Sequence, residues 1–282
     1  NAAFFPAGDV LLLFVVVGVV LFLTRSWSDR AIGVAAVVLL LQPVEWYHYI
    51  ANLINPAHRL PDLKVAEMYG EVADYTKAGN WRDFLLGNVT LGQKASFLWA
   101  VNAGRFVQTA GLFLLGFFIG RKQLFMTNEK NIAFGTKVLI ISAISFAPLY
   151  TLKELVMEND PIVQQTVGTA FDMWQKLAFT LVLVASFILL YQHKNFSKAV
   201  AGLRFYGKMS LTNYISQSII GVFIYFPIGL NLTPYCGYTF SLLVGFLIFL
   251  LQLRFCKWWL ARHKQGPLEY IWHKCTWIGT GK

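Results

Sequence analysis

Ser210, Asn213 and Gln217 place polar side chains at helical spacing at the start of an apolar stretch that continues to about Asn231. With Tyr214 they recur at i, i+3, i+4 and i+7, so they share one face of a helix. A stretch of this length crosses a bilayer, because about 20 apolar residues suffice. Polar groups in hydrocarbon need partners, so this face must look into the protein interior or a wet cavity. Two interpretations stay open: the face lines a substrate path, or its hydrogen bonds hold neighbouring helices together.

Arg105 is a second candidate for chemistry, because it lies about 14 Å along an apolar stretch at 1.5 Å per residue. An arginine near mid-membrane costs about 2.5–3.5 kcal/mol on insertion scales and marks a functional site by default. Asn102 and Gln108 flank it at i−3 and i+3, within one arc of a helix. We expect Gln217 at a similar depth, so these side chains are predicted to line one substrate-binding region. The alternative is a structural arginine paired with backbone carbonyls.

A third group of titratable residues is expected near the outer surface. Glu45 and His48 are three residues apart and share a helix face, and a carboxylate beside an imidazole suits general acid–base work. Asp9, at the start of the first apolar stretch, is a further acid that could pair with Arg105 or cap a helix. The alternative for His48 is an interfacial anchor among aromatic neighbours.

Composition indicates the elements that position these residues. The chain has 282 residues, of which 56% are hydrophobic and only 13% charged, against about 25% charged in soluble domains. Its apolar stretches are continuous, which predicts an all-α, polytopic transmembrane helical bundle. The net charge of +10 lies mostly in short loops beside spans, so we expect a lipid bilayer and not nucleic acid as the partner. The three cysteines form no disulfide framework, and no metal site is predicted.

The pattern predicts a transmembrane bundle over residues 1–256 with an outer loop at 52–95, and a cytoplasmic amphipathic tail at 257–282. Basic loops place the N-terminus of this chain outside and the C-terminus in the cytoplasm. The sequence shows no paired broken helices of the kind found in inverted-repeat transporters. Spans are expected at about 8–24, 31–51, 96–120, 132–153, 170–192, 208–230 and 235–256.

Several shorter segments of the sequence also predict local structure. Residues 62–86 are predicted to form one or two amphipathic helices. Gly116 and Gly120 predict close helix packing, and Asp172 with Lys176 predicts an intrahelical ion pair. The aromatic, basic tail is predicted to form an interfacial helix that starts near Pro267.

Two motifs in the C-terminal third resemble the paired signatures of the YeiB-like bacterial inner-membrane proteins, catalogued as domain of unknown function 418. They are Gly207-Lys208-Met209-Ser210-Leu211-Thr212-Asn213-Tyr214 with Gln217-Ser218, and Gly266-Pro267-Leu268-Glu269-Tyr270-Ile271-Trp272 with Thr276. Three upstream segments are also similar to family elements: Gly8-Asp9-Val10-Leu11, Tyr75-Thr76-Lys77-Ala78-Gly79, and Leu114-Leu115-Gly116 through Gly120-Arg121.

The resemblance implies more than these residues alone do. Family members begin with a cytoplasmic Leu-Asp-x-x-Arg-Gly element and about three further spans, which nothing in this chain matches, so we expect a ten-span whole protein whose N-terminal part is missing here. The relationship to transmembrane acyltransferases implies transfer of an acyl group from a cytoplasmic donor, with acyl-CoA as co-substrate and no tightly bound cofactor, to an envelope glycan or lipid acceptor. The competing hypotheses are a transporter or lipid-handling protein and a structural subunit. The oligomeric state stays open, a homo-oligomer included.

Overall fold

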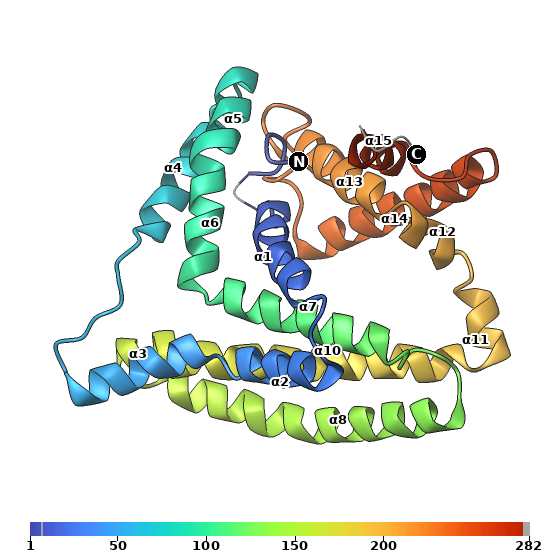
Figure 1. Cartoon of the computed structure of the whole chain (residues 1–282). Helices are drawn as coiled ribbons and strands as arrows, with labels where there is room; N and C mark the ends of the chain where they lie inside the picture. The colour runs from blue at the N-terminus through green and yellow to red at the C-terminus, as the bar shows by residue number, and fades with distance from the viewer. Residues whose placement is uncertain (7, 279–282) are drawn as a thin grey trace. The chain divides into compact units, whose positions relative to one another are not determined.

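The computed structural model describes residues 1–6 and 8–278, and this part of the chain is helical without a strand, which confirms the all-α prediction. Two compact units divide it, and each is described by itself (Figure 1). Unit 1 comprises residues 1–9, 66–95 and 195–282, and unit 2 comprises residues 10–65 and 96–194. The elements in chain order are α1 Leu11–Thr24, α2 Asp29–Leu40, α3 Pro43–Ile54, α4 Val65–Lys77, α5 Trp81–Gly87, η1 Asn88–Gly92, α6 Gln93–Asn102, α7 Arg105–Arg121, α8 Glu129–Met157, α9 Pro161–Val163, η2 Gln164–Gly168, α10 Thr169–Tyr191, α11 Lys194–Ala199, α12 Leu203–Lys208, α13 Ser210–Tyr225, α14 Tyr238–Leu260 and α15 Pro267–Thr276.

Three helices in the described residues are long and apolar enough to cross a membrane: α8, the continuous helix Pro161–Tyr191, and α14. Only 6% of the apolar window of α8 is buried, and an apolar surface so exposed suits lipid rather than water. The number of candidate spans rises to five if each of two bent helix pairs counts as one. The seven-span count therefore stays a prediction.

The two bent pairs correct the expectation of unbroken spans. α2 and α3 meet at an angle of 47°, and the helix Trp81–Asn102 meets α7 at 76°. The predicted span 31–51 is therefore broken near its middle, and the predicted span 96–120 is broken about a third of the way along, at residues 103–104. The predicted loop 52–95 differs as well, because helix begins at Trp81 and continues through the π-turn η1 into α6. The expectation of helices within residues 62–86 is confirmed by α4 and α5.

Unit 2 packs its helices in pairs. α8 and α10 lie side by side (Figure 1), with Lys153 3.7 Å from Asp172 across the pair. The predicted intrahelical pair is confirmed, since Lys176 Nζ lies 2.5 Å from Asp172 Oδ2. α8 continues across Pro148 to Met157. α2 packs on α7. At one end of this pair Lys122 Nζ forms an ion pair with Asp29 Oδ2 at 2.7 Å.

The glycine that allows α7 to approach α2 is Gly111, not Gly116 or Gly120. A Cβ on Gly111 would lie 2.9 Å from Leu40 Cγ and 3.2 Å from the Leu40 backbone nitrogen. A Cβ on Gly116 or Gly120 would meet no described atom within 4 Å. Within the described residues, therefore, Gly116 and Gly120 do not bring α7 close to another helix, because glycine spacing does not say which face of a helix meets a neighbour.

Unit 1 explains one upstream motif. Tyr75 donates a 2.7 Å hydrogen bond to Asn88 Oδ1, and Asn88 Nδ2 donates to the Ala3 carbonyl at 2.9 Å. Burial raises the pKa of Tyr75 to about 12, so its hydroxyl stays a donor at any physiological pH. Gly79 has φ +71° just beyond the end of α4, a left-handed position that favours glycine. The Tyr-x-x-x-Gly pattern thus fixes the turn from α4 to α5.

Substituting the two kinds of glycine in α7 should give opposite results. Gly111→Ala should lower the free energy of unfolding by about 1–3 kcal/mol, because the new methyl group overpacks against Leu40. Gly116→Ala, the matched control, should leave stability equal or raise it by up to about 1 kcal/mol through helix propensity. Unfolding of the detergent-solubilised protein measures both, and equal effects would contradict the assigned interface.

Candidate functional site

The break between α2 and α3 is built by Gln42 and Pro43. Gln42 adopts a left-handed conformation with φ 59°, and Pro43 lacks the N–H that would continue the helix. The Leu40 carbonyl at this break accepts a 2.8 Å hydrogen bond from Trp174 Nε1 of α10. A backbone group released at membrane depth needs such a partner inside the protein.

The second break meets the first. Gly104 has φ +59° between α6 and α7, and a Cβ there would lie 2.7 Å from Glu45 Oε1, 3.3 Å from Met173 Cε and 3.6 Å from Gln42 Oε1. The backbone angle favours glycine here, and the Glu45 side chain would have to shift to admit a larger residue. The N-termini of α3 and α7 begin beside each other, and each leaves unbonded N–H groups.

We call Gln42, Glu45, Gly104, Arg105 and Gln108 the break cluster. Gln42 is 1%, Glu45 5% and Gln108 7% exposed. Arg105 donates from Nη1 to Gln108 Oε1 at 2.7 Å, and its guanidinium lies 5.4 Å from the ring centre of Trp99. Two buried donors, Gln42 Nε2 and Arg105 Nε, have no hydrogen-bond partner among the described residues. Buried donors of this kind are costly unless an oxygen acceptor satisfies them.

The structure confirms one of the two predicted neighbours of Arg105 and not the other. Gln108 contacts Arg105 as the spacing predicts. Asn102 ends α6 on the other side of the break and is exposed, so the expectation of one arc is wrong for it. Sequence reasoning missed Gln42, although the pair Gln42-Pro43 carried a signal, because a residue before proline is disfavoured in a helix.

The predicted acid–base residues divide between the two units. His48 Nδ1 lies 3.1 Å from His58 Nε2, and the two rings stack at 5.4 Å. Glu45 lies on the same helix as His48 but in the break cluster, with no hydrogen bond to the imidazole among those found in the described part. Asp9 belongs to unit 1, where it is buried and accepts a 3.0 Å hydrogen bond from Asn1.

A second polar cluster, the amide cluster, joins α12, α13 and α14 in unit 1. Gln217 Nε2 donates to the Tyr206 hydroxyl at 2.5 Å and to Gln252 Oε1 at 3.0 Å. Asn213, 3% exposed, donates to the Tyr206 carbonyl at 3.1 Å and contacts the Cys256 thiol at 3.3 Å. Burial raises the pKa of Tyr206. These bonds are what the helix-joining interpretation expects, and the substrate-lining role of Asn213 and Gln217 stays a prediction.

Ser210 stands apart from this cluster, since it is exposed at the first position of α13. Arg105 and Gln108 belong to unit 2, whereas Asn213 and Gln217 belong to unit 1. One shared region at a common depth therefore stays a prediction.

The two C-terminal motifs meet at the N-termini of α13 and α15. Glu269 accepts from the Thr212 backbone N–H at 3.0 Å and from its hydroxyl at 2.5 Å. The Thr212 hydroxyl in turn accepts from the Leu268 N–H at 3.2 Å, so each helix caps the other. A side chain at Gly266 would collide with the Glu269 carboxylate. α15 begins at Pro267 in its first turn, as predicted.

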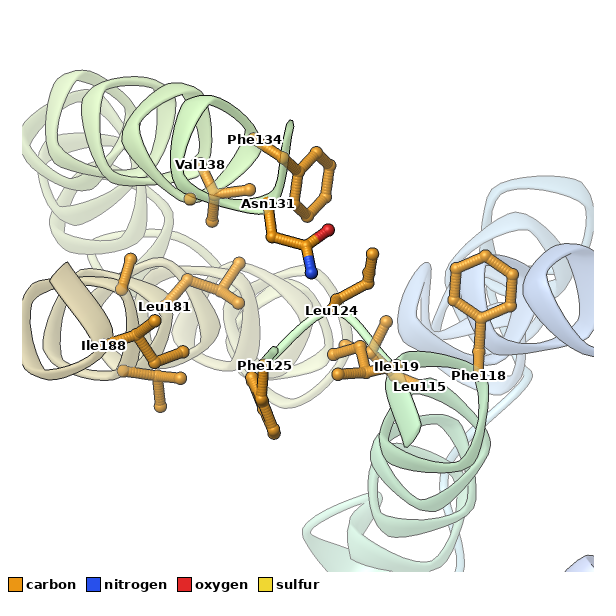
Figure 2. A pocket seen from close by; sticks show the side chains of 13 residues that line it. Leu115, Phe118, Ile119, Leu124, Phe125, Asn131, Phe134, Val138, Leu181 and Ile188 are labelled. Carbon is orange, nitrogen blue, oxygen red and sulfur yellow. The ribbon is translucent and has the colours of Figure 1, made fainter. Parts of the chain in front are cut away.

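A nearly apolar pocket of about 230 Å³ lies among α7, α8 and α10 in unit 2 (Figure 2). Asn131 is the one polar residue labelled there, and its side-chain nitrogen is occupied by the Gln123 and Met126 carbonyls at 3.0 and 2.8 Å. The pocket therefore offers mainly hydrocarbon contacts. It is lined by Leu115, Phe118, Ile119, Leu124, Phe125, Asn131, Phe134, Gly135, Val138, Leu181, Val184, Ala185 and Ile188.

These features define a helical membrane protein with two broken helices that meet at a buried polar cluster. The family model described as "Protein of unknown function (DUF418)" matches residues 119–279, more than half of the chain. The chain belongs to this family, which confirms the resemblance drawn from the two C-terminal motifs.

Three curated relatives match over shorter segments. The uncharacterized protein YxaH of Bacillus subtilis (strain 168) is 26% identical over 34% of this chain and 24% of its own length. The uncharacterized 39.9 kDa protein in amylase 3′ region of Bacillus acidopullulyticus is 35% identical over 32% of this chain and 25% of its own. The uncharacterized protein YeiB of Escherichia coli (strain K12) is 31% identical over 28% and 20%. The matched segment thus spans a quarter or less of each relative, and no solved structure matches.

The reciprocal cap between Thr212 and Glu269 should be energetically coupled. Thr212→Ala and Glu269→Ala should each lower the free energy of unfolding by about 1.5–3 kcal/mol, the range for hydrogen bonds to charged groups. The double variant should lose less than the sum, with a coupling of about 1 kcal/mol or more. Thr276→Ala is the control, because its hydroxyl bonds only within α15. Additive losses in detergent unfolding would contradict the reciprocal cap.

Proposed function

We propose that the protein is a membrane-embedded acyltransferase whose break cluster binds the reacting carbonyl of the donor. The observation that carries the proposal is the pair of buried donors, Gln42 Nε2 and Arg105 Nε, beside the N-termini of α3 and α7. Buried donors and helix N-termini in a dry site can stabilise negative charge that develops on an oxygen. The resemblance of the family to transmembrane acyltransferases supports the same class of reaction.

In this proposal the acceptor hydroxyl or amine attacks the carbonyl carbon of an acyl-CoA thioester. The new bond to the acceptor forms, the carbon–sulfur bond breaks, and the proton of the acceptor passes to a base and then to the leaving thiolate. Glu45, His48 and Asp9 are the candidate acids and bases, and Glu45 is the one within the break cluster. Arg105, Gln108 and Gln42 hold the carbonyl oxygen.

Other residues would bind the rest of the substrates. Asn213 and Gln217 line the donor path in this proposal, with Ser210 at its entrance and Asn102 beside the break. The apolar pocket of unit 2 suits an acyl chain, because its walls offer mainly hydrocarbon contacts. The acceptor is a glycan or lipid of the cell envelope, and the site of action is the bacterial inner membrane.

Binding of acyl-CoA to the purified protein tests the proposal. Acyl-CoA at 100 times its Kd should stabilise the folded protein by about 2.7 kcal/mol, seen as a rise in melting temperature with acetyl-CoA or a longer acyl-CoA. Arg105→Gln should abolish the rise, and Gln42→Met, which removes one buried donor at similar volume, should reduce it. Arg82→Gln changes an exposed arginine of α5 and serves as the charge-matched control.

The experiment has two informative outcomes. A rise in wild type and in Arg82→Gln that is lost in Arg105→Gln supports a donor at the break cluster. No rise with any CoA species, from protein that melts cooperatively, contradicts the acyl-CoA donor.

The second candidate function is transport, favoured by the meeting of two broken helices. Discontinuous helices that aim their N-termini at a bound anion are the usual substrate site of secondary transporters. On this hypothesis the break cluster binds a carboxylate without chemistry. Proteoliposomes should then take up radiolabelled acetate faster than protein-free vesicles, and Arg105→Gln should remove the excess while Arg82→Gln keeps it. Uptake equal to that of empty vesicles would count against transport of this anion class.

A further inference from the structure

A concave pocket of about 420 Å³ in unit 1 lies at the ends of α12 and α14. Lys208 comes from the last turn of α12, whereas Arg262, His263 and Lys264 follow α14. We call these four residues the basic pocket. Its remaining lining residues are Phe205, Leu260 and Ala261, so none of the seven is acidic.

The residues that line this pocket supply no counter-charge. Residues 195–282 contain nine lysines and arginines but a single acid, Glu269. Glu269 does not line the pocket, and its carboxylate oxygens accept hydrogen bonds from Thr212. Within the described part of the chain, no ion pair involves Lys208, Arg262 or Lys264.

Two of the basic side chains are held in place by the end of α14. The Arg262 guanidinium lies 5.0 Å from the ring centre of Trp258. The His263 ring stacks on Trp259 at 4.1 Å, and its Nδ1 lies 3.2 Å from the Trp259 carbonyl. If Nδ1 donates this bond, Nε2 is the nitrogen left for another partner. Groups fixed in this way lose little conformational entropy when they bind an anion.

Basic residues beside membrane spans have an ordinary explanation, because lysine and arginine retain loops in the cytoplasm and favour helix C-termini. That explanation accounts for the presence of the charges. It does not account for their convergence from α12 and from the segment after α14 into one concavity without an acid.

We propose that the basic pocket binds the phosphodiester group of an anionic phospholipid headgroup. Arginine and lysine together suit phosphate oxygens, by forked hydrogen bonds and by point charge. Trp258, Tyr270 and Trp272 of the same unit are 50%, 48% and 67% exposed, and such aromatics gather at the headgroup level of a bilayer. This setting favours a lipid phosphate over a soluble one, and the proposal does not depend on the acyltransferase hypothesis.

Retention of defined lipids by the purified full chain tests the proposal. The protein in neutral detergent is titrated with phosphatidylglycerol or phosphatidylcholine, and bound lipid is counted by native mass spectrometry. The pocket variant carries Lys208→Gln, Arg262→Gln and Lys264→Gln. The control variant carries Lys198→Gln, Lys257→Gln and Lys274→Gln, which remove the same charge from the same segment outside the pocket.

We expect wild type and the control variant to prefer phosphatidylglycerol, and the pocket variant to bind it about tenfold more weakly or worse, as expected for three lost basic contacts. Melting temperatures within the range of wild type establish that both variants fold. Equal binding by both variants, or no preference over phosphatidylcholine, would overturn the proposal. Displacement of the lipid by millimolar inorganic phosphate or CoA would keep a phosphate site but overturn its assignment to lipid.

Discussion

The structure of unit 2 depends on one constraint: backbone groups released by a helix break in apolar surroundings must find partners inside the protein. At the break between Gln42 and Pro43, the indole N–H of Trp174 donates a hydrogen bond to the Leu40 carbonyl and so meets this requirement. The break at Gly104 lies against Glu45 and Gln42. The two breaks thus lie beside each other, and the side chains next to them form the buried polar cluster.

The same reasoning separates the proposed catalytic cluster from a structural one. The amide cluster of unit 1 satisfies its own side chains, since Gln217, Gln252 and Tyr206 bond one another. The break cluster instead leaves two buried donors without an acceptor among the described residues. Satisfied polar networks hold helices in register, whereas convergent unsatisfied donors suit a bound oxygen. This contrast is why the proposed chemistry lies at Arg105 rather than at Asn213.

Acyl transfer and anion transport begin from the same physical element. Both need an oxygen atom held by fixed donors at the N-termini of α3 and α7. They differ in whether a base removes a proton from an acceptor there, and Glu45 is the residue of the cluster to which we assign that role in the acyltransferase proposal. In unit 1 the reciprocal cap plays a different part, because it joins the N-termini of α13 and α15 and lies outside the lining of the basic pocket.

The sequence by itself determined the all-α class, the helix that begins at Pro267, the pair Asp172–Lys176 and the contact of Arg105 with Gln108. Each of these follows from composition or from spacing within one helix, where neighbours lie three or four residues apart. The tertiary structure decided what depends on residues far apart in the chain. It placed Gly104 against Glu45, Thr212 against Glu269 and Leu40 against Gly111. Hydropathy is averaged over a window, so a break of one or two residues leaves no signal in it. For this reason the sequence did not predict the role of Gln42, and it placed Asn102 on the same helix as Arg105. Packing between helices decides which of their faces meet, and a periodic pattern within one helix does not predict that packing.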